Sequence, residues 1–200
     1  PQEITATTKK PEWTWYATGP GIGIQLVHGP RKGRLIIPCD HIEAESNKYY
    51  SHIIYSDDHG KTWALGGRTL TDQVNECQIA ELTDGTLMLN MRNYYRGPKS
   101  RAVSTSTDGG LTWSKITYDE QLPEPRCQAS LISYQPKEQD PLILLFSNPA
   151  HKDQRINMTV RASLDEGKTW PIAQTLYPSS AAYPSGKRPT SSRLFTSTFP

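Results

Sequence analysis

The chain has 200 residues, with 22 basic and 20 acidic side chains and a formal net charge of +2. This small, scattered charge excludes the clustered basic face that nucleic-acid binding requires, and no apolar run approaches the roughly 20 residues that cross a bilayer. Sixteen Pro and fourteen Gly punctuate short runs of β-branched and aromatic residues, which favours an all-β protein.

Residues 1–12 form a lead-in to the first strands. They lack the basic-then-apolar pattern of a signal peptide. The sequence begins with Pro1 rather than Met, and we therefore expect a truncated start. The sequence does not indicate the cellular compartment or the oligomeric state.

Short strand-like runs fill most of the remaining sequence, and turns rich in Gly, Pro and Asp separate them. The turn at Asp84-Gly85 is a strong hairpin signal. No segment has helical periodicity. The expected strands are 22–26, 34–38, 49–55, 77–82, 86–91, 101–105, 128–134, 142–147 and 157–162.

Three copies of the pattern S-x-D-x-G-x-T-W occur, at residues 56–63, 106–113 and 163–170. Their aspartates, Asp58, Asp108 and Asp165, are separated by 50 and 57 residues, close to the period of a propeller blade. The carboxylate can accept hydrogen bonds from backbone N–H groups across a turn, and the glycine allows positive φ. None of the copies has the alternating oxygens and distant Glu of an EF-hand, so we assign them a structural role.

Four short strands fall in each unit of about 50 residues, with the repeat between the third and fourth strands. This arrangement predicts a β-propeller blade. A metal site is not expected, because the three cysteines form no C-x-x-C pair and the five histidines lack ligand spacing. No cofactor is expected either.

The repeats resemble the Asp box, or bacterial neuraminidase repeat. The connecting segments 15–21, 75–78, 89–93 and 155–161 resemble blocks of exo-α-sialidases of the bacterial and animal type. The resemblance runs over residues 13–183. It implies a six-bladed propeller of about twice this length, of which the chain covers roughly three to four blades.

The resemblance implies two arginines for the carboxylate of sialic acid, Arg92 and Arg155, since a planar guanidinium pairs with a carboxylate through two hydrogen bonds. It implies Tyr183 as nucleophile and Glu76 as its base. A neutral tyrosine avoids the repulsion that a carboxylate would meet beside an anomeric carbon bearing a carboxylate. Without the resemblance, the arginines read as surface ion pairs, Glu76 as a polar residue beside a strand, and Tyr183 as one of ten tyrosines.

Asp40 and His41 follow the expected end of a strand, where the resemblance places pocket residues; a polar loop is the alternative. The resemblance also implies a general-acid Asp and a first arginine in an Arg-Ile-Pro motif, and neither is identified in this sequence. Residues 184–200 depart from the pattern, since they are basic and rich in Ser and Pro where an apolar strand is expected.

We therefore expect an exo-α-sialidase that cleaves terminal α-linked sialic acid from glycans with retention, and the partner is a sialylated glycan. The isolated 200 residues are expected to lack activity, because the acid and one arginine are missing. The alternative is a non-catalytic Asp-box propeller that binds glycans or proteins, or a degenerate sialidase. Linkage preference, and hydrolysis versus transfer, stay open.

Overall fold

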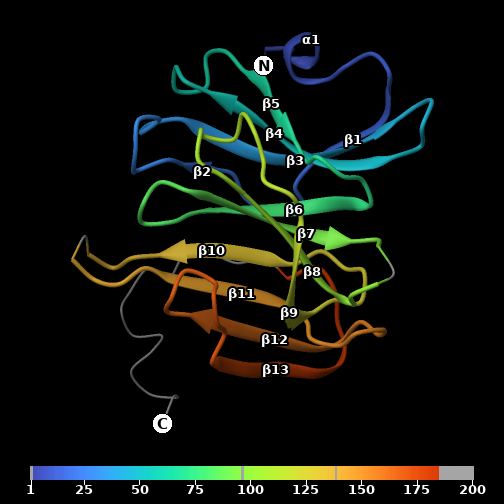
Figure 1. The fold of residues 1–200 in the computed structure, drawn as a ribbon, viewed down its shortest axis with the longest axis vertical. Coiled ribbons are helices and arrows are strands. Elements are labelled where there is room, and N and C mark those ends of the chain that lie inside the picture. Colours follow the sequence, from blue (N-terminus) through green and yellow to red (C-terminus); the bar gives the residue numbers. More distant parts are fainter. Residues whose placement is uncertain (1, 96, 138, 185–200) are drawn as a thin grey trace.

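The protein is described by a computed structural model that covers residues 2–95, 97–137 and 139–184. Antiparallel strands make up three sheets, which follow one another along the chain and stack face to face (Figure 1). The helix α1 (Thr5–Thr8) has only four residues. Within the described residues, no helix is long and apolar enough to cross a membrane.

Each sheet is a meander of strands. The first blade is ordered β1 (Trp13–Thr18), β3 (Leu35–Glu43), β4 (Tyr49–Ser56) and β5 (Ala64–Arg68), and the short β2 (Ile24–Gln25) also pairs with β3. The second blade is β6 (Val74–Glu81), β7 (Leu87–Asn93), β8 (Ser100–Ser106) and β9 (Thr117–Pro123). The third blade is β10 (Ser130–Tyr134), β11 (Ile143–Pro149), β12 (Ile156–Ser163) and β13 (Ile172–Ser180).

Most of the expected strands are found, but two predictions for the first blade were wrong. The strand expected at 34–38 continues to Glu43, and only Ile24–Gln25 remains of the strand expected at 22–26. Pro38 lies inside β3 although it cannot donate to a ladder. In the structure it lies where pairing with β2 has stopped and pairing with β1 has not begun, since β2 pairs with Leu35 and Ile36 and β1 with positions from Cys39 onward.

The three Asp boxes form the turns between the third and fourth strands of their blades. Asp108 shows the bonding. Its Oδ1 accepts hydrogen bonds from the backbone N–H groups of Leu111 and Thr112 and from the Ser106 hydroxyl, and its Oδ2 accepts one from the Thr112 hydroxyl. Gly110 adopts φ of 88°, which favours glycine. Partial burial acts to raise the pKa of Asp108, but the hydrogen bonds outweigh it and lower that pKa to about 2.

Apolar side chains join neighbouring blades. One buried cluster combines Ile36 and Ile53 of the first blade with residues of the second, including Trp113. The Trp113 indole also donates a hydrogen bond of 3.0 Å to the carbonyl of Gly67. A second cluster joins the second and third blades: Ala80, Leu82, Met88, Leu122, Ala129, Leu131, Leu142, Leu144, Phe146 and Trp170. The blades therefore stack through apolar faces, as propeller blades do.

Candidate active site

The candidate residues gather at one end of the blades, opposite the Asp-box turns. Glu76 lies near the start of β6, Arg92 near the end of β7, and Arg155 directly before β12. Because neighbouring strands are antiparallel, the start of one strand and the end of the next lie at the same end of the sheet, and these positions therefore lie at the same end of their blades. Tyr183 follows the last strand, β13, and comes to the same end.

The carboxylate of Glu76 joins Arg92 and Tyr183. Arg92 Nη1 lies 2.6 Å from Glu76 Oε2, and the two side chains are only 14% and 16% exposed. The Tyr183 hydroxyl donates to the other oxygen, Oε1, at 3.2 Å. The Arg92 guanidinium also lies 4.8 Å from the centre of the Tyr94 ring. A carboxylate, a guanidinium and a phenol thus converge although the chain brings them from three separate segments.

The segment that carries Tyr183 is held by the third blade. The Ala181 N–H donates to the Arg155 carbonyl at 2.8 Å, and the Ser130 hydroxyl donates to the Pro184 carbonyl at 2.6 Å. The Arg155 guanidinium carbon lies 6.0 Å from the centre of the Tyr183 ring. Its Nη2 donates to the Arg126 carbonyl at 2.8 Å. Arg155 is exposed at this end of the blades, beside the tyrosine.

Asp40 is buried below this cluster and reaches it through Asn75. Its Oδ1 accepts hydrogen bonds from the Trp15 indole at 2.9 Å and from the Asn75 amide at 3.2 Å. The Asn75 carbonyl oxygen of the side chain in turn accepts the N–H of Glu76. Burial raises the pKa of Asp40 to about 7, and the negative charge of Glu76 adds to that rise.

His41 does not join the cluster. The expectation that Asp40 and His41 follow a strand end was wrong, because both lie inside β3, where successive side chains point to opposite faces. His41 is fully buried, stacks on Trp13 with ring centres 3.6 Å apart, and shares a 2.9 Å hydrogen bond between Nδ1 atoms with His52.

Sequence reasoning assigned no individual role to Trp15, Asn75, Tyr94 or Arg126. Trp15 and Asn75 lie inside segments that drew attention, but their bonds to Asp40 depend on the pairing of β1 with β3 and on the packing of β3 beside β6. Tyr94 directly follows the arginine-bearing strand. Nothing in the sequence pattern set Arg126 apart.

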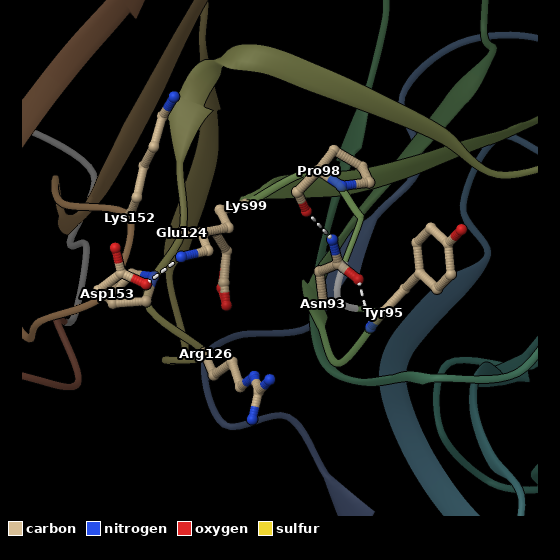
Figure 2. Close-up of a pocket in the computed structure, with 9 residues that line it drawn as sticks. Asn93, Tyr95, Pro98, Lys99, Glu124, Arg126, Lys152 and Asp153 are labelled. Atoms are coloured by element: carbon tan, nitrogen blue, oxygen red, sulfur yellow. Dashed lines mark hydrogen bonds and ion pairs between the residues drawn. The ribbon is translucent and has the colours of Figure 1, made fainter.

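A pocket of about 460 Å³ lies beside the cluster, between the second and third blades (Figure 2). Three connections at the same end of the sheets form its walls: the β7–β8 loop, the β9–β10 connection and the β11–β12 hairpin. Its lining residues are Asn93, Tyr95, Pro98, Lys99, Glu124, Pro125, Arg126, Lys152 and Asp153. The pocket therefore begins one residue beyond Arg92 and two residues before Arg155.

The fold and these residues define a protein made of Asp-box propeller blades with a polar cluster at one end. The BNR repeat-like domain family matches residues 3–191, and the chain belongs to this family.

Known sialidases are similar to the chain in sequence. It is 38% identical over 185 residues to a sialidase of Micromonospora viridifaciens, covering 90% of this chain and 28% of that protein. It is 39% identical over 173 residues to a sialidase of Bacteroides fragilis, covering 85% of this chain and 30% of that protein. The chain thus spans less than a third of these relatives.

Solved sialidases share the fold. The Hadza microbial sialidase Hz136 superposes with a TM-score of 0.78 at 37% identity, over 88% of this chain and 34% of that one. The intramolecular trans-sialidase from Ruminococcus gnavus, in complex with oseltamivir carboxylate, superposes with a TM-score of 0.70 at 27% identity, over 87% and 37%. The prediction of an all-β fold built of propeller blades is confirmed.

Proposed function

We propose that the protein containing this chain is an exo-α-sialidase that releases terminal α-linked sialic acid from glycans with retention of configuration. The hydrogen bond from the Tyr183 hydroxyl to Glu76 carries the proposal. A scaffold or binding propeller has no need of a phenol held against a carboxylate that is itself paired with an arginine.

Arg92 and Arg155 suit recognition of the substrate's carboxylate. Each guanidinium presents several N–H donors in a fixed plane and keeps its charge at every physiological pH. Arg92 is oriented by Glu76, and Arg155 by the Arg126 carbonyl. A sialic acid carboxylate placed between them would bring its anomeric carbon near Tyr183.

Tyr183 and Glu76 would perform the first chemical step together. As the Tyr183 oxygen bonds to the anomeric carbon, its proton passes to Glu76, and the bond to the leaving oxygen breaks. Tyrosine nucleophiles are the stated exception to the two-carboxylate rule for glycosidases. The alcohol that departs takes a proton from a general acid. Water then attacks the anomeric carbon of the tyrosyl intermediate and gives a proton to the conjugate base of that general acid. The bond to the tyrosine oxygen breaks as Glu76 returns the proton to that oxygen, and two inversions give net retention.

The competing function is a glycan- or protein-binding propeller without turnover. The full-length protein should be assayed on 4-methylumbelliferyl sialoside and on 3′-sialyllactose, with the anomer of the first product read by proton NMR. We expect release of the α-anomer and loss of nearly all turnover in Tyr183→Phe. Binding of sialyllactose without turnover would instead support the binding propeller.

Product analysis in the same assay separates hydrolysis from transfer. Free sialic acid indicates attack by water on the intermediate. An anhydro product or a new sialoside indicates capture of the intermediate by a sugar hydroxyl.

A further inference from the structure

We propose that the pocket between the second and third blades is the subsite for the leaving-group side of the glycan, and that it favours an anionic sugar there. This inference rests on the proposed function. It adds a specificity site to the cluster of Glu76, Arg92, Arg155 and Tyr183.

The position of the pocket supports the first part. Arg126 lines it with its side chain, while the Arg126 carbonyl holds the Arg155 guanidinium at 2.8 Å. Asn93 lines the opposite side and directly follows Arg92. With the substrate's carboxylate between the two arginines, the remainder of the glycan would lie within reach of this pocket.

Two wall residues, Glu124 and Asn93, are held by internal contacts. Glu124 is 3% exposed, and it accepts a hydrogen bond from the Cys127 N–H at 3.0 Å and faces the fully buried Arg101 at 3.5 Å. Asn93 is 4% exposed and donates to the carbonyls of Pro98 and Ser100 while accepting the Tyr95 N–H. Figure 2 shows Asn93 tying Pro98 to Tyr95 on one side of the pocket. Pre-formed walls are typical of ligand sites.

The charges favour an anion. Lys99 pairs with Asp153, and Glu124 pairs with Arg101, so both lining carboxylates are already compensated. Among the described residues, no carboxylate lies within ion-pair distance of Arg126 or Lys152. Lys152 acts on Asp153 only at longer range, and Lys99 is the cation in direct contact with that carboxylate. Arg126 and Lys152 can therefore meet a negative group, and Tyr95, which is 49% exposed, adds an aromatic surface for a sugar face.

The negative group could be the carboxylate of a second sialic acid or a sulfate on the penultimate sugar. The double variant Arg126→Gln/Lys152→Gln removes both charges and keeps polar side chains, and the Arg126 carbonyl that holds Arg155 is a backbone group, which the variant retains. Lys115→Gln is the control, because Lys115 is exposed at the Asp-box end of the second blade. The full-length protein and both variants should be assayed on 4-methylumbelliferyl sialoside, 3′-sialyllactose, an α2,8-linked disialoside and a 6-sulfated sialyl-lactosamine.

We expect kcat/KM of the double variant to fall roughly tenfold on an anionic substrate, with less than a twofold change on the two neutral leaving groups. The anionic substrate that responds identifies the carboxylate or the sulfate as the natural group. Equal losses on all four substrates, or no loss on either anionic one, would overturn the subsite. A wild-type protein inactive on all four would instead refute the proposed function.

Discussion

The hydroxyl of Tyr183 lies 3.2 Å from Glu76 Oε1 although 107 positions separate the two residues. The contact spans the second and third blades and depends on the hydrogen bonds that hold Ala181 and Pro184 to the third blade. Its chemistry depends on Glu76 as an acceptor of the phenolic proton, and this dependence can be tested at the carboxylate.

Glu76→Gln should lower kcat on 4-methylumbelliferyl sialoside by a factor of roughly 100 to 10,000, because an amide cannot take the proton from Tyr183. The variant keeps an oxygen that can accept from Arg92, so the site should stay assembled. Steady-state kinetics on the full-length protein measure the effect. Glu45→Gln, an exposed carboxylate in the β3–β4 turn, is the matched control. A Glu76→Gln enzyme within threefold of wild type would remove Glu76 from the mechanism.

Arg155→Lys should lower kcat/KM by a factor of roughly 10 to 100, since lysine is a point charge that cannot form the paired hydrogen bonds of a guanidinium with a carboxylate. The same variant should weaken binding of a carboxylate-bearing transition-state analogue, which isothermal titration calorimetry measures directly. Arg31→Lys, at an exposed position of the first blade, should leave both quantities unchanged. Near-normal kinetics in Arg155→Lys would defeat the assignment.

The sequence predicted what is local. The turns at the Asp boxes and at Asp84-Gly85 were predicted from residues only a few positions apart. These turns separate the strands within each blade. Pairings between distant segments were not predictable in this way. The strand β1 pairs with the second half of β3, and neither segment was among the expected strands.

In the candidate site, too, single residues were predictable and their contacts across distant segments were not. Residue types and blocks singled out Glu76, Arg92, Arg155 and Tyr183, but their convergence required the antiparallel order of the strands. His41 and its neighbour Asp40 were treated alike. β3 continues to Glu43, five residues beyond the expected end, so both residues lie inside the strand. The alternation of the strand then sends Asp40 toward Asn75 and His41 toward Trp13.

Asp108→Ala should lower the free energy of unfolding by about 1–2 kcal/mol, comparable to the loss of a helix cap, because several turn donors lose their acceptor. The low pKa of Asp108, about 2, means that its stabilisation is present above roughly pH 4 and is lost as pH falls toward 2. Urea denaturation at pH 7 and pH 3 measures both effects. Glu120→Ala, exposed on β9, is the control and should change stability little. An Asp108→Ala protein as stable as wild type at pH 7 would contradict this role.

Asp40→Asn should alter how stability depends on pH. The folded pKa of about 7 exceeds that of an unfolded aspartate, so raising the pH from about 4 to 7 costs stability, because the unfolded carboxyl ionises first. The cost is at most about 1.4 kcal/mol per pH unit. An asparagine oxygen can still accept from Trp15 and Asn75, and it does not ionise. We expect Asp40→Asn to gain stability relative to wild type as pH rises through this range. A difference that stays constant from pH 4.5 to 7.5 would show that Asp40 does not titrate as described.

The buried pair of His41 and His52 should give the opposite dependence on pH. Burial lowers the pKa of His41 to about 3, with Arg68 and Lys10 adding to the effect, and burial followed by the proximity of His41 lowers that of His52. Their Nδ1 atoms share one hydrogen bond at 2.9 Å, which requires a proton on one Nδ1 and an unprotonated Nδ1 on the other ring.

The unfolded histidines therefore bind protons below about pH 6.5 while the folded pair does not, and stability falls as pH drops, by about 1.4 kcal/mol per pH unit for each histidine. His52→Asn places an amide nitrogen near the lost Nδ1 but removes one titrating group. We expect it to lower stability at pH 7.5 and to reduce the slope between pH 4.5 and 6.5.

His59→Asn is the control: His59 is exposed with φ of 59°, a conformation that asparagine tolerates. Because Asp40 changes stability with pH in the reverse direction, the dependence of unfolding free energy on pH should be measured in the Asp40→Asn background, once with His52 intact and once with His52→Asn. An unchanged slope in His52→Asn there would mean that the pair does not resist protonation in the folded protein.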